Sequence, residues 1–137
     1  MIGAQASNDQ YEKKVFMTVE RVSCTETAQA VIEQLRLQHG ALLFYQNGGC
    51  CDGSAPMCFA QGDFLIGVQD VYLGAIHGCP FYMAVDQFEF YKNTHITVDV
   101  TKGSGASFSL EIPLGLRFIA ISRLLTEAEL NAIQTVE

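Results

Sequence analysis

The chain has 137 residues, of which 49% are hydrophobic and 17% are charged, and this composition excludes a disordered or low-complexity protein. The length is that of one ordinary domain, and no apolar run approaches a membrane span. The net charge of -7 argues against a nucleic-acid backbone or an anionic membrane as partner. We therefore expect one globular domain over residues 13–137, preceded by a loose tail over residues 1–12.

The first ten residues carry no positively charged stretch followed by an apolar core, so they do not have the pattern of a secretory signal. The chain contains five cysteines, an odd count. In a chain without an export signal, cysteines are expected to be reduced thiols in the cytoplasm, where they are available for metal binding or redox chemistry.

The first third of the chain predicts a strand, a helix and a second strand. Residues 14–22 alternate with period two and predict a strand at a sheet edge. Ser23 and Glu26 have the spacing of a capping box, in which the Ser23 hydroxyl accepts from the Glu26 amide. The helix that follows is predicted to end at Gly40. Its apolar stripe consists of Ala28, Val31, Ile32 and Leu35.

The remaining elements are mostly short strands between glycine turns. They are a buried strand at 41–45, strands at 57–60, 63–68 and 70–76, an apolar segment at 79–84, a short helix from Asp86, a strand at 95–100, β segments at 108–112 and 116–121, and a terminal helix behind a second capping box at Thr126–Glu129. Few gaps between strands could hold crossover helices. We therefore predict an α+β domain: an amphipathic helix near the N-terminus, a compact and mostly antiparallel or mixed β body, and a short C-terminal helix.

Three of the five cysteines gather in residues 45–58, which we call the cysteine loop. Thiolates are soft, charged ligands, and three or four of them close a tetrahedral zinc or iron site. Cys50, Cys51 and Cys58 are thus predicted metal ligands, with Cys79 or His77 as the fourth. Cys50 and Cys51 can share a metal only if the loop glycines bend the backbone, because neighbouring side chains of an extended chain point to opposite faces.

Other interpretations of the same residues stay open. One cysteine could instead act as a nucleophile on an aldehyde, with Asp52 or a histidine moving the proton. The thiols could also be inert core groups in a structural interaction module. His95 is a weaker candidate ligand, and solvated carboxylates are the favoured interpretation of Asp70, Asp99 and Glu111. The chain has no nucleotide-binding glycine motif and no phosphate loop, so it is not itself an NAD-dependent dehydrogenase.

The cysteine motif and several later motifs resemble a bacterial family of uncharacterised small proteins, a domain of unknown function. The resemblance covers roughly residues 25 to 123 and is carried by the motifs at 48–59, 70–74, 81–83, 87–89 and 108–111. Members of that family are often encoded near aldehyde or alcohol dehydrogenases, and are sometimes labelled acetaldehyde dehydrogenase for that reason. The resemblance implies a domain without an established activity and a partner enzyme of aldehyde or alcohol metabolism.

The motif from Gly48 to Gly53 is also similar to the glycine–cysteine loop of the A-type (HesB-like) iron–sulfur carriers. That resemblance implies an amphipathic helix that leads through a strand into the loop and a compact β body. The C-terminal Cys-Gly-Cys pair of that family has no counterpart here, because no cysteine follows Glu111. Only Cys50 or Cys51 therefore corresponds to a ligand of those carriers.

The sequence as a whole favours a cytoplasmic metal-binding protein that assists a partner enzyme and has no catalytic cycle of its own. Zinc or iron is the expected metal, and no nucleotide cofactor is expected. An apolar, glycine-rich β domain is also expected to be able to form a homodimer.

Overall fold

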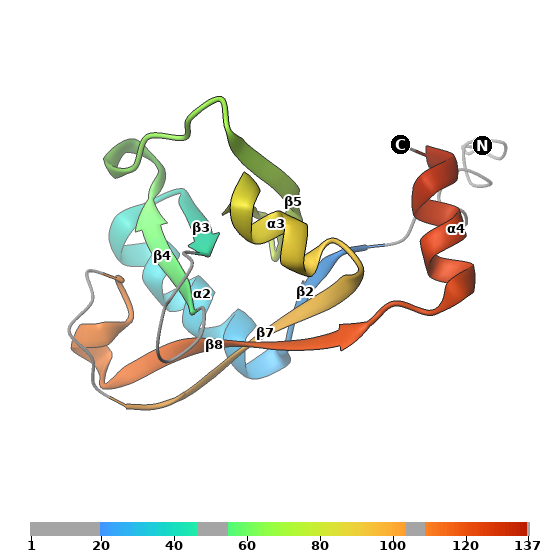
Figure 1. The fold of residues 1–137 in the computed structure, drawn as a ribbon. Helices are drawn as coiled ribbons and strands as arrows, with labels where there is room; N and C mark the ends of the chain where they lie inside the picture. The colour runs from blue at the N-terminus through green and yellow to red at the C-terminus, as the bar shows by residue number, and fades with distance from the viewer. Residues whose placement is uncertain (1–19, 47–54, 104–108, 137) are drawn as a thin grey trace, which may run out of the picture.

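A computed structural model describes residues 20–46, 55–103 and 109–136 of the chain, so the predicted tail at 1–12 lies outside the described residues. In chain order the elements are β2 (Val22–Cys24), α2 (Glu26–His39), β3 (Leu42–Gln46), β4 (Pro56–Ala60), the 3-10 helix η1 (Gln61–Asp63), β5 (Asp70–Ile76), β6 (Cys79–Ala84), α3 (Val85–Tyr91), β7 (Thr94–Lys102), the 3-10 helix η2 (Ile112–Leu114), β8 (Leu116–Leu124) and α4 (Glu127–Val136) (Figure 1). Within the described ranges, no helix is long and apolar enough to cross a membrane.

The larger sheet has four strands in the order β4-β3-β6-β5. β3 pairs antiparallel with β4 and parallel with β6, so Gln46 lies between Pro56 and Met83 at one end of the sheet. All five residues of β3 are buried, as expected for a central strand covered on both faces. β3 therefore forms the middle of the fold, and its last residue marks the point where the chain enters the cysteine loop.

The smaller sheet has three strands in the order β2-β7-β8. β2 pairs parallel with β7, so Val22 lies beside Ile96, and β7 pairs antiparallel with β8 over nine residues on each strand. β2 also packs on β5 of the larger sheet. This contact is close at Gly74, whose φ of +137 favours glycine and whose added Cβ would lie 3.2 Å from Val22 Cγ2. The two sheets are thus joined along β2 and β5.

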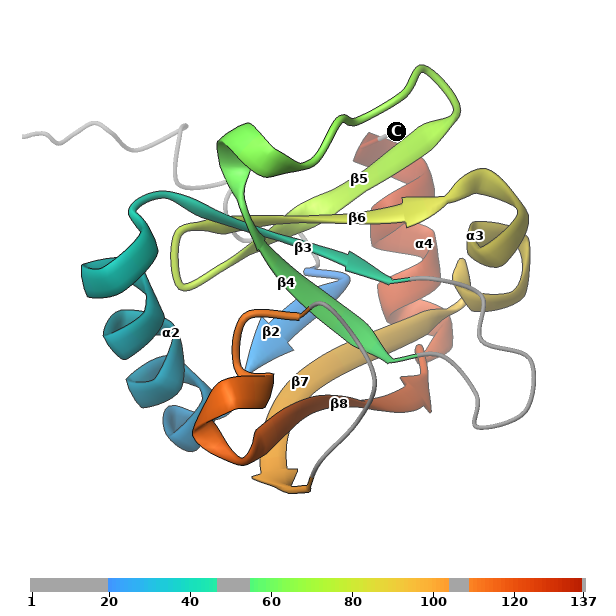
Figure 2. The same cartoon turned by 90° about the vertical axis from the view of Figure 1, so that its left-hand side faces the viewer.

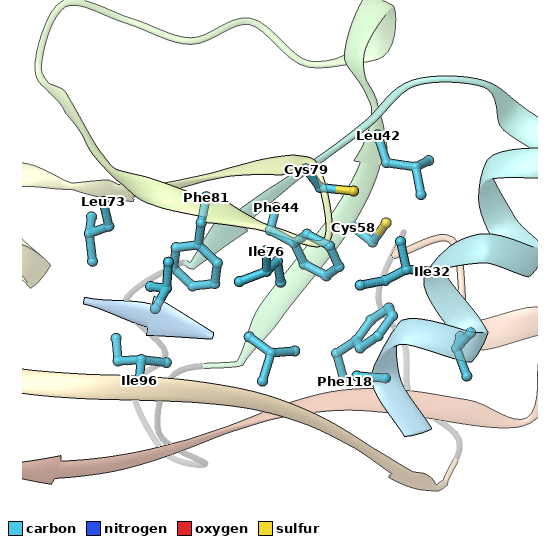
Figure 3. Close-up of a cluster of buried hydrophobic side chains, with 14 of the residues drawn as sticks. Ile32, Leu42, Phe44, Cys58, Leu73, Ile76, Cys79, Phe81, Ile96 and Phe118 are labelled. Carbon is cyan, nitrogen blue, oxygen red and sulfur yellow. The ribbon is translucent and has the colours of Figure 1, made fainter. Parts of the chain in front are cut away.

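The hydrophobic core lies between the two sheets and is closed on one side by α2 (Figure 2). The larger sheet contributes Phe44 and Phe81, whose rings stack with centroids 6.3 Å apart, and Phe118 of β8 meets Phe44 edge-on at 5.0 Å (Figure 3). α2 contributes the apolar stripe predicted from the sequence: Ala28, Val31, Ile32 and Leu35 are all buried. The packing of three different elements around Phe44 makes this ring the centre of the core.

Several predicted elements are confirmed and three details are corrected. The strands at 41–45 and 70–76, the first helix and the mixed α+β character agree with the prediction. The N-cap of α2 is Thr25, whose hydroxyl accepts from the Ala28 amide at 3.1 Å, because Ser23 is held in β2. Residues 64–68 form an irregular connection and not a strand. A strand was predicted at 108–112, but residues 109–112 form a turn that leads into η2.

Tyr45 links the irregular connection at residues 64–68 to the outer face of the larger sheet. Its ring lies 4.9 Å from that of Phe64, and its hydroxyl donates to Asp70 Oδ1 at 2.7 Å. Asp70 Oδ2 in turn accepts from the Gly67 amide at 2.7 Å. Burial, together with the bond to Asp70 and its negative charge, raises the pKa of Tyr45 to about 12.

This pKa predicts an alkaline loss of stability that depends on Tyr45. The unfolded chain releases the tyrosine proton near pH 10 and the folded chain only near pH 12, so the contribution is fully present below pH 10 and is lost as the pH rises towards 12. We expect Tyr45→Phe to flatten the fall in unfolding free energy between these pH values, measured by urea titration. Tyr72→Phe, at a tyrosine that is 58% exposed, is the matched control. An equal slope in the wild type and Tyr45→Phe would contradict this assignment.

Candidate functional site

The cysteine loop joins two neighbouring strands at one end of the larger sheet. Its described ends are Gln46, the last residue of β3, and Pro56, the first residue of β4, which are paired across the ladder. Cys50, Cys51 and Asp52 lie outside the described residues. The strands therefore fix where the loop leaves and re-enters the sheet, and the side chains around these two points form the described part of the candidate site.

Gln46 brings a polar side chain into the apolar interior at this point. Successive residues of a strand point to opposite faces, so Gln46 shares the inner face of the sheet with Phe44 and Leu42, both of which belong to the core. Only 1% of Gln46 is exposed, and among the residues that the structure describes its Oε1 atom has no hydrogen-bond partner. A buried amide oxygen left unpaired costs about 1–3 kcal/mol, so a hydrogen-bond donor or a positively charged group beside Gln46 would stabilise the base of the loop.

Cys58 lies on the same inner face as Gln46. It is paired directly with Phe44 across the ladder, and its level in the sheet is therefore two residues from that of Gln46. Its side chain is fully buried in the core, near Ile32 of α2 (Figure 3). Gln46 and Cys58 thus place an amide oxygen and a thiol on neighbouring positions of one buried face, beside the end of the sheet that carries the loop.

A buried polar network holds β4 at Cys58. The Cys58 amide donates to Ser109 Oγ at 2.8 Å, and the Cys58 carbonyl accepts from the Leu110 amide at 3.0 Å. Ser109 Oγ donates to Glu111 Oε1, and Glu111 Oε2 accepts from the Phe118 amide at 2.9 Å. Glu111 is only 2% exposed, so the prediction that it is a solvated carboxylate is wrong; it joins β4 to β8.

Two of the described thiols, Cys24 and Cys58, are poorly suited to act as nucleophiles. Burial raises the pKa of Cys58 well above its ordinary value, and the nearby Glu111 carboxylate and Cys79 raise it further. Burial also raises the pKa of Cys24, against the opposing effect of a hydrogen bond with Gln29. Since the thiolate is the reactive form, neither Cys24 nor Cys58 is activated by its surroundings.

Cys79 and His77 lie at the other end of the larger sheet. β6 runs parallel to β3 with Phe81 beside Phe44, so Cys79 is level with Leu42. A strand rises roughly 3.3 Å per residue, and Cys79 is therefore about 13 Å along the sheet from the level of Gln46. Figure 2 shows the β5–β6 turn beside α2, opposite the end where β3 leads into the loop.

Side chains of α2 hold His77 and Cys79. The Nε2 atom of His77 lies 2.8 Å from Glu33 Oε2, and Arg36 Nη2 donates to the His77 carbonyl and, at 3.2 Å, to Cys79 Sγ. His77 has a φ of +47, an unusual value for a residue with a side chain. These contacts fix the β5–β6 turn, with His77 and Cys79, to α2.

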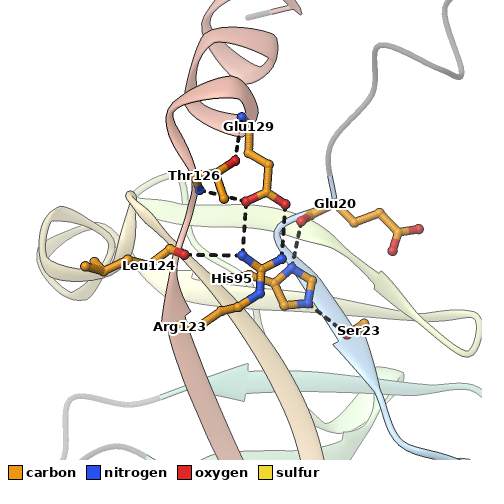
Figure 4. A network of polar contacts seen from close by, with 7 residues as sticks. All are labelled: Glu20, Ser23, His95, Arg123, Leu124, Thr126 and Glu129. Atoms are coloured by element: carbon orange, nitrogen blue, oxygen red, sulfur yellow. Dashed lines mark hydrogen bonds and ion pairs between the residues drawn. The ribbon is translucent and has the colours of Figure 1, made fainter.

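His95, the weaker predicted ligand, links β7 to β2 (Figure 4). Its Nδ1 atom lies 2.9 Å from the Glu20 carbonyl, which can only accept, so Nδ1 carries the proton of the neutral ring. Nε2 then accepts from the Ser23 hydroxyl at 2.9 Å. Beside it, Arg123 pairs with Glu129 of the confirmed second capping box. Both nitrogens of His95 are therefore engaged in holding the small sheet together.

Among the residues that the structure describes, no group of three histidine, cysteine or acidic side chains could hold a metal ion. Of the predicted ligands, Cys58 lies two residues along the sheet from the level of Gln46, whereas Cys79 lies two residues beyond the level of Cys58, in the β5–β6 turn region with His77. Gln46 was missed by sequence reasoning. The sequence pattern that could have identified Gln46 is a polar residue directly after an apolar strand, at a position that shares the inner face with Phe44.

Comparisons with known proteins give a matching family model and a solved structure with partial similarity. The family model for a domain of unknown function (DUF779) matches residues 31–124, in agreement with the resemblance drawn from the cysteine motif. A crystal structure of IscA with the [2Fe-2S] cluster matches with a TM-score of 0.45 and 15% sequence identity, over 73% of this chain and 83% of that chain. A search of curated proteins found no match.

Proposed function

The chain belongs to this family of unknown function, DUF779, and we propose that it binds a soft metal ion, zinc or iron, at the end of the larger sheet where β3 leads into the cysteine loop. Cys50, Cys51 and Cys58 are the proposed thiolate ligands. Three thiolates and one further ligand make the tetrahedral set that these metals prefer in proteins.

The unpaired Oε1 atom of Gln46 is the observation that carries this proposal. It is a buried acceptor without a donor among the described residues, at the base of a loop that contains two adjacent thiols. A metal ion, or a water bound to it, would supply the positive or hydrogen-bonding group that this atom lacks. Gln46 or a water is accordingly the proposed fourth ligand, in place of Cys79 and His77, which lie at the other end of the sheet.

Metal content of the purified protein tests the proposal. We expect about one zinc or iron per chain after anaerobic purification, measured by mass spectrometry, and loss of most of it in Cys50→Ser and Cys51→Ser. Cys58→Ser is expected to weaken retention against a chelator. Metal binding must displace the Cys58 proton, so retention in the wild type should also weaken as the pH falls.

Cys24→Ser is the matched control, because Cys24 is a thiol of β2 outside the loop. His77→Ala should also retain the metal. A wild-type protein with substoichiometric metal, or equal metal loss in Cys24→Ser and Cys51→Ser, would rule the proposed site out.

We further propose that the protein serves a partner enzyme of aldehyde or alcohol metabolism in the cytoplasm, where thiols stay reduced. The resemblance to a family encoded near such enzymes motivates the choice of partner. The raised pKa values of Cys24 and Cys58 argue against these two thiols as the nucleophile of the alternative, a thiol-dependent reaction on an aldehyde. Co-purification of the tagged protein with an aldehyde or alcohol dehydrogenase from its host would support the association.

A further inference from the structure

Exposed apolar side chains gather where the η1–β5 connection meets β5 and α3. Leu65 is 92% exposed, Val68 is 102% exposed and Tyr72 is 58% exposed, with Ile66 and Val85 at 36% and 38%. We call these five residues the apolar patch. Soluble proteins rarely leave large apolar side chains exposed in contiguous groups unless another molecule covers them.

Backbone contacts hold the segments of the patch together. The Asp70 amide donates to the Gly67 carbonyl at 3.1 Å, which closes the turn between Val68 and β5, and the Val85 amide donates to the Gln69 carbonyl at 3.2 Å. Tyr72 lies against Tyr82 of β6, with ring centroids 5.6 Å apart. Figures 1 and 2 both show the η1–β5 connection and β5 at the same edge of the molecule. The segments that carry the five exposed side chains are therefore held next to one another.

The segments that carry the patch bear only negative charges of their own, and the basic side chains Arg21 and Lys92 contact α3 further along, at Phe88 and Glu89. Between Arg36 and Lys92 the sequence contains no lysine or arginine, and it contains five acidic residues. Three of these, Asp63, Asp70 and Asp86, stand in or beside the segments that carry the patch. Asp70 is engaged by Tyr45 and Gly67, while Asp63 and Asp86 are exposed. A molecule that covers this surface meets apolar groups with a negative rim.

We infer that the apolar patch is a docking surface for a protein partner that presents apolar side chains together with lysines or arginines. A basic rim on the partner complements the acidic rim here and favours association. A second copy of this chain, docked by the same face around a two-fold axis, would instead bring one acidic rim against another. The surface does not depend on the metal site, so a protein that bound no metal would still carry it.

Two synthetic peptides test the charge preference of the patch. Both are amphipathic and equal in length and apolar content, one built from lysine and leucine and the other from glutamate and leucine. With the full ¹⁵N-labelled chain, we expect only the lysine peptide to bind, with backbone shift changes confined to residues 64–72 and 85, and with affinity that falls as salt is added. Leu65→Ser combined with Val68→Ser should weaken this binding about tenfold.

Leu37→Ser and Leu124→Ser are the matched controls, since these leucines are 89% and 77% exposed elsewhere on the chain, and they should leave the affinity unchanged. Equal binding of both peptides, or shift changes away from the patch, would overturn the inference. So would self-association in sedimentation that Leu65→Ser abolishes, because the occupant would then be a second copy. If the metal-free protein still binds the lysine peptide, the docking surface is independent of the proposed metal site.

Discussion

Phe44→Ala is expected to lower the free energy of unfolding by about 3–5 kcal/mol, the usual cost of removing a buried phenylalanine from a packed core. Phe44 is fully buried and touches the rings of both Phe81 and Phe118. Removing it opens a cavity between the two sheets, where neither sheet can move in without disturbing the paired strands. Urea denaturation followed by circular dichroism measures the change.

Phe90→Ala is the matched control for Phe44, because it removes the same atoms from a ring on α3 that is 79% exposed. Its effect should stay within about 0.5 kcal/mol. If Phe44→Ala cost as little as Phe90→Ala, the two sheets would not be packed around this ring, and the arrangement of the core would be wrong.

Glu111→Ala should cost about 2–4 kcal/mol, because it leaves the Phe118 amide and the Ser109 hydroxyl buried without their acceptors. Both donors lie at the contact between β4 and β8. Glu111→Gln keeps the shape of the side chain and one acceptor oxygen, so it should cost less than Glu111→Ala. Urea denaturation of the two variants gives this order.

Glu89→Ala provides the comparison for Glu111, since Glu89 is an exposed carboxylate of α3 paired with Lys92. An exposed ion pair contributes little, so this variant should behave like the wild type. Equal stability of Glu89→Ala and Glu111→Ala would mean that the buried network does not hold β4 to β8.

Patterns within one segment predicted much of the fold. α2 followed from an apolar stripe with a helical period, and the reciprocal bonds between Thr126 and Glu129 followed from the capping-box spacing. The cap of α2 was misplaced at Ser23 because a neighbouring threonine could serve equally well. β2 decides between them by pairing Ser23 with Thr97, a contact 74 positions away that no local pattern contains.

The candidate site was less predictable for the same reason. Cys58 and Cys79 are both thiols in apolar segments, and their sequence positions do not show that they belong to different levels of the sheet. That fact comes from the parallel pairing of β3 with β6. The sequence around Glu111 likewise does not distinguish it from a surface glutamate, because its burial depends on the donors of Ser109 and Phe118. Burial of a polar residue depends on partners that are distant in sequence.

The two sheets also differ in how they can assemble. All four strands of the larger sheet lie within residues 42–84, whereas the smaller sheet must bring Val22 beside Ile96. Closing such a long stretch of chain costs entropy before any contact is gained. The strands of the larger sheet therefore close shorter stretches of chain than the pairing of β2 with β7 requires. We expect local opening of the three-residue strand β2 to expose part of the core to water while the larger sheet stays paired.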